Sequence, residues 1–187
     1  RPMIPYDTAR SKALLKEAGY KGEELIFRVN GSYYANYLEA AQIMQQMWKA
    51  VGINVKIEVK DANPAAMTEG GYDMRAWSVG LQIPDPLFPL SSDYSATTGR
   101  SRPGAITRLW EVPKELQDLE DQLSTVMDAA ERRRIFSRIV DLMEDEMVSV
   151  GLYRASEFYA VRKGVEWKPY TLWMMDFGPG NLKFTGK

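Results

Sequence analysis

The sequence predicts an α/β fold in which a mixed sheet is flanked by helices. Residues 25–60 run from an alternating strand through an amphipathic helix into a second alternating strand, with short connections. A strand, helix, strand unit of this kind is expected to close as a right-handed parallel pair. A third alternating stretch lies at 72–79, and two amphipathic helices lie at about 113–148. At 187 residues, the chain is long enough to bury one substantial core.

The first 30 residues predict a helix followed by a strand. Asp7 can cap a helix that runs to about Ala18, because its carboxylate accepts hydrogen bonds from the free N–H groups of the first turn. Gly19 then allows the left-handed conformation in which many helices end. In the strand at 25–30, apolar side chains share one face, and the strand ends at an Asn-Gly turn.

The next segment predicts a helix at about 33–51, a strand at 53–60 and a short helix at 62–69. Apolar residues of the long helix recur at steps of three and four, which places them in one stripe. In the strand at 53–60, Ile and Val residues alternate with polar ones, so one face is apolar. The third strand, at 72–79, follows two glycines and contains Trp77 near its end.

A long segment without periodicity, from Gly80 to about Arg108, follows the third strand. Irregular loops of this length are uncommon in compact domains and are usually binding loops, lids or disordered segments. Its composition is rich in Ser and Thr, which suits a loop. Its prolines are Pro84, Pro86, Pro89 and Pro103.

The second of the two late helices, at about 128–148, is expected to depend on its neighbours. Asp128 and Glu131 form a capping box at its start. Three arginines follow near the start and three acids stand at the end, so the charges oppose the helix dipole. Each exposed charge of this kind costs roughly 0.3 to 1 kcal/mol, so packing must hold the helix. The expected buried face consists of Ile135, Ile139, Leu142, Met143 and Met147.

Composition argues against several classes of function. The net charge is -1, with 24 Lys and Arg residues scattered among 25 acids, so no basic stripe is present to neutralise nucleic-acid phosphates. The chain has no His and no Cys, which removes imidazole bases, thiol nucleophiles and the usual ligands of zinc. It has no phosphate-binding glycine motif and no nucleophile elbow. We therefore expect no enzyme activity, no metal or other cofactor and no nucleic-acid partner.

Trp77 is the strongest candidate for a ligand contact. Ligands of open α/β sheets bind outside the carboxyl ends of the strands, where an indole can form a flat apolar wall. The alternative is that Trp77 fills the core under the sheet. Arg75, Asp85, Tyr94 and Arg102 are the expected polar contacts. Surface ion pairing is the alternative role for the two arginines, and a turn carboxylate between prolines is the alternative for Asp85.

Four blocks of sequence follow one another in a characteristic order. They are YDTARSKALLKEAGY, AAQIMQQMWKAVGINVKIEV, YDMRAW followed by PDP, and MDAAERRRIFSRIVDLMEDEMVSVGLY. Together they resemble the family 5 extracellular solute-binding proteins, the dipeptide- and oligopeptide-binding components of ABC importers. The resemblance implies a type II periplasmic-binding-protein lobe. Residues 1–150 would form the C-terminal ligand-binding lobe, and residues 151–187 would return to pack on an N-terminal lobe that precedes this chain.

The same resemblance implies a function and a location. The intact protein would capture a peptide or peptide-like solute and present it to a membrane permease. It would lie in the periplasm or another extracytoplasmic space, with a lipid anchor as one way of holding it there.

The sequence of the tail predicts two short strands around Ala155 and Ser156. The tail beyond Gly151 is also expected to expose apolar surface and to favour self-association of the isolated chain.

One departure from the family pattern concerns the solute. Peptide-binding members carry an acid three residues after the strand tryptophan, which holds the α-ammonium group of the peptide. Gly80 occupies that position here, and Asp85 can replace the acid only if the loop folds back. A buried ammonium without a carboxylate partner is costly, so solutes without a free amine gain ground, such as sugars, opines or modified peptides. A sensory domain of a transcriptional regulator is the other alternative.

Overall fold

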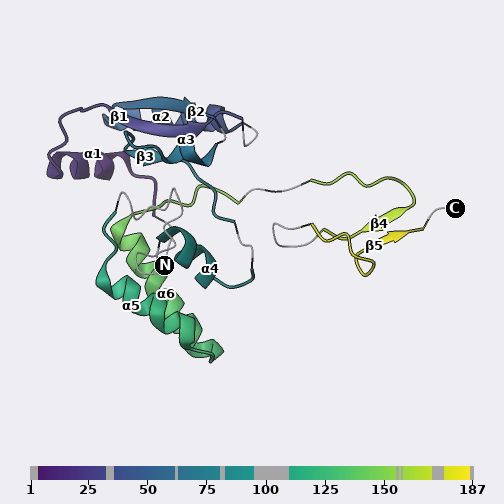
Figure 1. Ribbon diagram of the computed structural model, residues 1–187. Helices are drawn as coiled ribbons and strands as arrows, with labels where there is room; N and C mark the ends of the chain where they lie inside the picture. The colour runs from purple at the N-terminus through teal and green to yellow at the C-terminus, as the bar shows by residue number, and fades with distance from the viewer. Residues whose placement is uncertain are drawn as a thin grey trace. The chain divides into compact units, whose positions relative to one another are not determined.

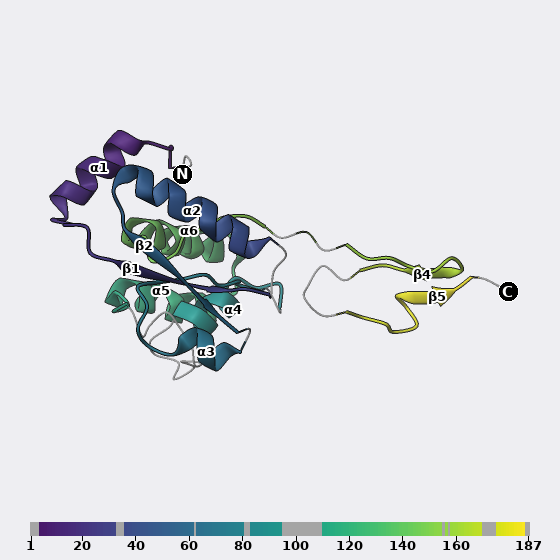
Figure 2. The ribbon, with the colours of Figure 1, turned by 90° about the horizontal axis from the view of Figure 1, so that it is seen from above.

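The chain divides into two compact units, Arg1–Ser78 and Val79–Lys187. Their secondary-structure elements are drawn in two views (Figures 1 and 2). The computed structural model describes residues 4–32, 36–61, 63–80, 83–94, 110–154, 156, 158–169 and 175–185. The predicted boundary between residues 150 and 151 concerns packing on a lobe outside this chain, and it stays a prediction.

The first unit is built on a parallel three-stranded sheet with the order β2-β1-β3. β1 and β2 pair along their whole length, from Leu25 opposite Val55 to Asn30 opposite Lys60, which confirms the predicted strand, helix, strand crossover. Figure 2 shows α2 running along these two strands. The elements are α1 (Thr8–Glu17), β1 (Leu25–Asn30), α2 (Tyr37–Val51), β2 (Val55–Lys60), α3 (Pro64–Thr68) and β3 (Met74–Arg75).

The ends of these elements follow the local signals in the sequence. The Asp7 carboxylate accepts a hydrogen bond from the Arg10 N–H at 2.8 Å and caps α1 as predicted. Gly52 ends α2 with a φ of 100°, a left-handed conformation that side chains other than glycine rarely adopt. After β1, the Asn30 side chain accepts from the Ser32 N–H at 2.9 Å and turns the chain.

The third strand is shorter than predicted. β3 contains only Met74 and Arg75, which pair with Phe27 and Arg28 of β1, whereas the alternation predicted a strand over 72–79. Continued by two residues, this register would place Trp77 opposite Asn30, the last residue of β1. β3 stops pairing at Arg75 although β1 continues to Asn30, so Trp77 lies two residues beyond the end of β3.

The core of the first unit lies between the sheet and α2. Phe27, Val29 and Ala41 are almost completely removed from solvent. The rings of Phe27 and Trp48 meet edge to face with their centroids 5.2 Å apart, a favoured arrangement for aromatic pairs. This burial confirms the apolar stripe that the sequence predicted for α2.

Arg28 stands on the opposite face of the sheet and is only 2% exposed. Its Nε donates to the Glu58 carboxylate of β2 at 2.6 Å. The remaining N–H groups donate to the carbonyl oxygens of Ala66, Glu69 and Gly70, in and just after α3. The last carbonyl groups of a helix have no partner within it, so this guanidinium supplies the missing donors. We call this set of contacts the Arg28 clamp.

The second unit contains a helical core and a separate hairpin. Both predicted late helices are confirmed. The segment from Gly80 to Arg108, predicted to be irregular, is helical over residues 87–94. Of the two strands predicted around Ala155 and Ser156, Ala155 lies outside the described residues, and the described residues on either side of it, 151–154, 156 and 158–162, form no strand. The described strands of the tail lie further along the chain. The elements are α4 (Leu87–Pro89), the π-helical turn η1 (Leu90–Tyr94), α5 (Lys114–Thr125), α6 (Ala129–Glu146), β4 (Val165–Trp167) and β5 (Leu182–Phe184).

The helical core of the second unit joins α5 and α6. Ile135 and Ile139 are buried as predicted, but Met147 is 51% exposed because it is the left-handed residue that ends α6, with a φ of 50°. The capping box is half formed. Asp128 caps the Glu131 N–H at 2.8 Å, while the Glu131 carboxylate binds Arg134 instead of reaching back. The buried members are Leu90, Val112, Leu116, Leu123, Ile135 and Ile139.

An ion pair attaches the proline-rich segment to this helical core. The Asp85 carboxylate receives two hydrogen bonds from Nη2 of Arg132, at 2.9 and 2.7 Å, and it also accepts from the Leu87 N–H at 2.9 Å. Nη1 of Arg132 donates to the carbonyl oxygens of Leu123 and Val126 at the end of α5. Arg132 therefore ties α4, α5 and α6 together.

Replacing Arg28 with Gln is expected to lower the free energy of unfolding by about 3 kcal/mol, because Glu58 and the carbonyl groups lose their donor. Urea denaturation followed by circular dichroism measures this. Lys114→Gln is the control, since it removes an exposed i,i+4 pair with Asp118 and should cost less than about 0.5 kcal/mol. A loss for Arg28→Gln that is no larger than the control would contradict the assignment.

The ion pair between Arg28 and Glu58 should also make the stability of the protein depend on pH. The hydrogen bond from Arg28 lowers the pKa of Glu58 below its ordinary value of 4.5. Because the folded-state pKa is the lower one, the contribution is fully present above about 4.5 and is lost as the pH falls through the folded-state value. Glu58→Gln should flatten this part of the stability curve. An unchanged curve would argue against the pair.

Removing the Asp85 carboxylate should loosen the second unit. Asp85→Asn keeps an acceptor for the Leu87 N–H but loses the charge opposite Arg132, so we expect a loss of about 1 kcal/mol and a Tm lower by roughly 2 to 4 °C. Asp85→Ala loses both interactions and should fall further. Scanning calorimetry measures both variants against Asp118→Asn, an exposed control. Equal Tm values for Asp85→Ala and the unmodified chain would be incompatible with this role.

Candidate functional site

Two arginines and one acid stand in a row across the face of the sheet that carries the Arg28 clamp. Arg28 is the register partner of Glu58 on one side and of Arg75 on the other. Register partners on neighbouring strands project from the same face of a sheet. The row therefore runs from the carboxylate on β2 to a guanidinium on β1 and a second guanidinium on β3.

Two aromatic rings alternate with these arginines. The Arg28 guanidinium carbon lies 4.4 Å from the ring centroid of Tyr72, and that of Arg75 lies 6.0 Å from the same ring. Arg75 also lies 4.5 Å from the ring centroid of Trp77. Guanidinium groups within about 6 Å of an aromatic face are attracted by the charge distribution of the ring. We call these four residues the Arg–aromatic ladder.

The ladder ends on an exposed tryptophan. The interpretation of Trp77 as a core residue under the sheet is wrong, since 44% of this residue is exposed. The other end of the ladder, at Arg28, is buried. The ladder therefore connects the interior of the first unit to an aromatic surface beyond the carboxyl end of β3. Contact of Trp77 with a solute stays a prediction.

The remaining candidates belong to the second unit or lie outside the described residues. Gly80 is exposed, and a Cβ built on it meets no heavy atom within 4 Å, so the local structure does not require glycine there. Asp85 uses its carboxylate within the second unit, on Arg132 and the Leu87 N–H. Tyr94 is half-buried at the end of η1. Arg102 lies outside the described residues. Arg75 and Trp77 are the two candidates that the structure brings into contact.

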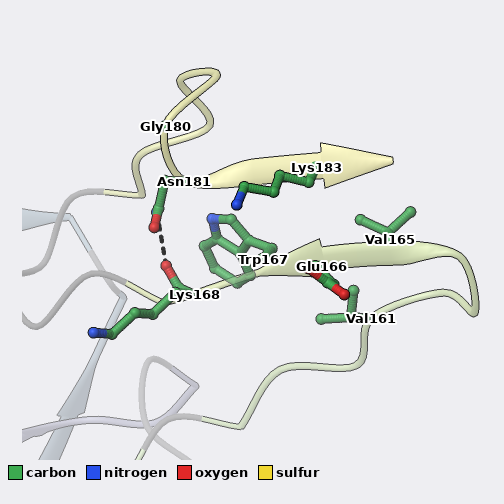
Figure 3. A pocket seen from close by; sticks show the side chains of 8 residues that line it. All are labelled: Val161, Val165, Glu166, Trp167, Lys168, Gly180, Asn181 and Lys183. Carbon is green, nitrogen blue, oxygen red and sulfur yellow. Dashed lines mark hydrogen bonds between the residues drawn. The ribbon is translucent and has the colours of Figure 1, made fainter. Parts of the chain in front are cut away.

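A hollow in the hairpin was not predicted from the sequence. It has a volume of about 430 Å³ and lies against the antiparallel pair β4 and β5 (Figure 3). Trp167 stacks on Phe177 with centroids 5.3 Å apart and donates from its indole N–H to the Asp176 carbonyl at 2.8 Å. Asn181 donates to the Lys168 carbonyl at 2.7 Å, as Figure 3 shows. The aromatic-rich composition of the tail was the one available signal.

A second hollow, of about 530 Å³, lies in the first unit where α1 and α2 end. Its rim carries basic side chains and the glycines that terminate both helices, and neither hollow includes Trp77. Its lining includes Lys12, Lys16, Gly19, Tyr20, Lys21 and Gly52.

The described parts of the chain contain no group of three or more acidic, His or Cys side chains that could hold a metal ion. Among the helices described, none combines the length and the apolar character needed to cross a membrane. The first unit offers an exposed aromatic side chain, Trp77, with the Arg75 guanidinium over its ring, an arrangement that suits non-covalent contacts.

The fold is shared with solute-binding proteins of known structure. NikA from Staphylococcus aureus, in complex with Ni(L-His)2, has a TM-score of 0.67 at 17% identity over 79% of this chain. AppA from Bacillus subtilis, in complex with a nonapeptide, has a TM-score of 0.61 at 15% identity over 79%. AgaA from A. tumefaciens R10, in complex with agropinic acid, has a TM-score of 0.57 at 25% identity over 71%.

These matches cover only part of each structure. The chain spans 31% of NikA, 32% of AppA and 27% of AgaA. No curated protein matches the chain. A family model does match it, over residues 1–101, which is more than half of the 187 residues and includes the whole first unit, Trp77 and Asp85. The protein belongs to the bacterial extracellular solute-binding proteins of family 5, and its α/β fold is that of type II periplasmic binding proteins.

Proposed function

We propose that this chain is the C-terminal lobe of a receptor that captures a small solute for an ABC importer, with Trp77 as one wall of the solute site. The exposed indole at the carboxyl end of β3, backed by Arg75, carries this proposal. Solutes of open α/β sheets bind outside the carboxyl ends of strands, and a flat aromatic ring gives a large contact area with little loss of side-chain entropy.

The related structures leave the identity of the solute open. Their solutes are a nickel complex of histidine, a nonapeptide and agropinic acid, so one fold accommodates different chemistry. Gly80 replaces the acid expected after the strand tryptophan, and the Asp85 carboxylate is bound to Arg132. Both observations favour a solute without a free amine over an unmodified peptide.

The family supports a proposal for the location and the partner of the intact protein. Its members are described as extracellular solute-binding proteins, which favours an importer receptor over the sensory domain of a transcriptional regulator. We place the intact protein in the periplasm or another extracytoplasmic space, where lobe closure over the solute would present the receptor to its membrane permease. Binding and release without turnover are the expected activities.

The division into a lobe over residues 1–150 and a return segment over residues 151–187 belongs to the same proposal. The matched residues make up 79% of this chain but only 31% and 32% of the related structures, so those structures contain surfaces that the chain lacks. Large apolar side chains stand exposed in and just before the β4–β5 hairpin, and packing on an N-terminal lobe would cover them. They include Leu152, Tyr153, Phe158, Met175, Phe177 and Phe184.

Replacing Trp77 with Ala should weaken solute binding at least tenfold, which corresponds to about 1.4 kcal/mol, because the solute loses its aromatic wall. Trp77→Phe should lose less, since a smaller ring remains. Isothermal titration calorimetry on the natural protein that carries this chain, with panels of peptides, sugars and opines, measures the affinity. Met127→Ala, which removes an 89% exposed side chain elsewhere, is the control. Tight binding that is unchanged in Trp77→Ala would refute the proposal.

The isolated chain should self-associate through the exposed tail. Phe158 and Phe184 are 93% and 78% exposed, and apolar patches of this kind tend to find partners. Sedimentation velocity at increasing concentration should show a growing fraction of oligomer, and Phe158→Ser combined with Phe184→Ser should reduce it. A strictly monomeric profile at high concentration would count against this prediction.

A further inference from the structure

Trp77 has few specific contacts that hold it in place. It lies two residues beyond the end of β3, just after the Ala76 N–H that donates to the Arg28 carbonyl at 2.9 Å. Among the residues that the structure describes, Trp77 takes part in no hydrogen bond, and its one contact with a cation or a ring is with Arg75, at 4.5 Å. Since 44% of Trp77 is exposed, packing restrains only part of the indole. The position of the Arg75 guanidinium therefore has a large effect on how the ring lies.

The Arg75 guanidinium is in turn held by its surroundings. Its carbon lies 6.0 Å from the ring centroid of Tyr72, at the outer limit of about 6 Å within which a ring attracts a guanidinium. Nη1 of Arg75 is removed from solvent, so the group is enclosed on this side. Removing the Tyr72 ring would leave space beside Arg75 and would allow the guanidinium to shift away from the indole.

Tyr72 is fixed through both its ring and its backbone. The Arg28 guanidinium carbon lies 4.4 Å from its ring centroid, and Arg28 is itself buried in the Arg28 clamp. The next residue, Asp73, donates its N–H to the Ile26 carbonyl at 3.0 Å, and its carboxylate accepts from the Ile26 N–H at 2.7 Å. Within the described parts of the chain, no hydrogen bond involves the Tyr72 hydroxyl. The ring is therefore the part of Tyr72 that contacts the Arg–aromatic ladder.

We infer that Tyr72 is a positioning residue for Trp77, because its ring holds the Arg75 guanidinium and Arg75 holds the indole. The chain of contacts begins at a buried cation and ends at an exposed ring, so it fixes a surface side chain from the interior. A ring that is already fixed loses less conformational entropy when it binds than a mobile one. The benefit for a solute rests on the proposed role of Trp77, whereas the positioning itself does not.

Fluorine NMR measures the positioning directly. The natural protein that carries this chain is labelled with 5-fluorotryptophan, and the Trp77 signal is the one that disappears in Trp77→Phe. Arg75→Gln removes the guanidinium and gives the position of the signal for an indole without this contact. Tyr72→Leu should move the Trp77 signal by roughly half of that displacement or more, because Arg75 loses the ring beside it. The signals of the other tryptophans should stay in place, which separates this effect from a general loss of structure.

Tyr72→Phe shows whether the ring or the hydroxyl is responsible. It keeps the ring, so the Trp77 signal should stay where it is in the unmodified protein. Tyr6→Leu is the matched control, since it makes the same change at a tyrosine that is 76% exposed in the same unit, and it should not move the signal. Thermal melting checks the fold of each variant, and Tyr72→Met replaces Tyr72→Leu if the latter does not fold.

The outcomes separate this inference from the proposed function. A Trp77 signal that stays in place in Tyr72→Leu, or that moves as far in Tyr72→Phe, would overturn the inference and leave the receptor role standing. Calorimetry with trialanine, galactose and agropinic acid as probes should show binding weakened about threefold or more in Tyr72→Leu and unchanged in Tyr72→Phe. Probe binding that is indifferent to Trp77→Ala would refute the proposed site but not the positioning of the indole by Tyr72.

Discussion

The first unit depends on a single buried cation. Arg28 is almost completely enclosed, and a buried guanidinium is tolerated only when its N–H groups are bonded and its charge is paired. Glu58 supplies the charge, and the carbonyl groups around the end of α3 accept the remaining hydrogen bonds. β2 is already paired with β1 along six residues, and Arg28 adds the link that holds the end of α3 against this face of the sheet. Through Tyr72 the same residue supports the Arg–aromatic ladder that ends on Trp77.

In the second unit, an ion pair between Asp85 and Arg132 has a similar structural role. Asp85 lies between two prolines, where the chain has few backbone donors of its own. Its ion pair with Arg132 holds the start of α4, and Arg132 also binds the carbonyl groups that end α5. The proline-rich segment is thus attached to the helical core at a defined point. Asp85, which was a candidate for binding an ammonium group of the solute, therefore has a structural role.

Two features of the sequence and structure concern the chemistry of the solute. Members of one fold family differ in what they bind because the scaffold is shared while individual side chains at the site vary. In this protein a glycine stands where peptide receptors have an acid, and a guanidinium backs the exposed indole. If Trp77 lines the solute site as we propose, the missing acid disfavours an ammonium group of the solute at this position. Under that proposal, the peptide specificity implied by the resemblance is the part of the family pattern that fits this chain least.

The sequence by itself determined the elements whose signals are local. Asp7, Gly52 and the alternation of residues 25–30 act within a few residues of the structure they specify, so helix ends, strands and the parallel crossover were predictable. Tertiary structure alone decided the features that need a distant partner. β3 stops at Arg75 although β1 continues to Asn30, and Asp85 pairs with a residue 47 positions away. Arg28 reads as the polar side of an alternating strand, and only the packing of α3 made it a buried clamp.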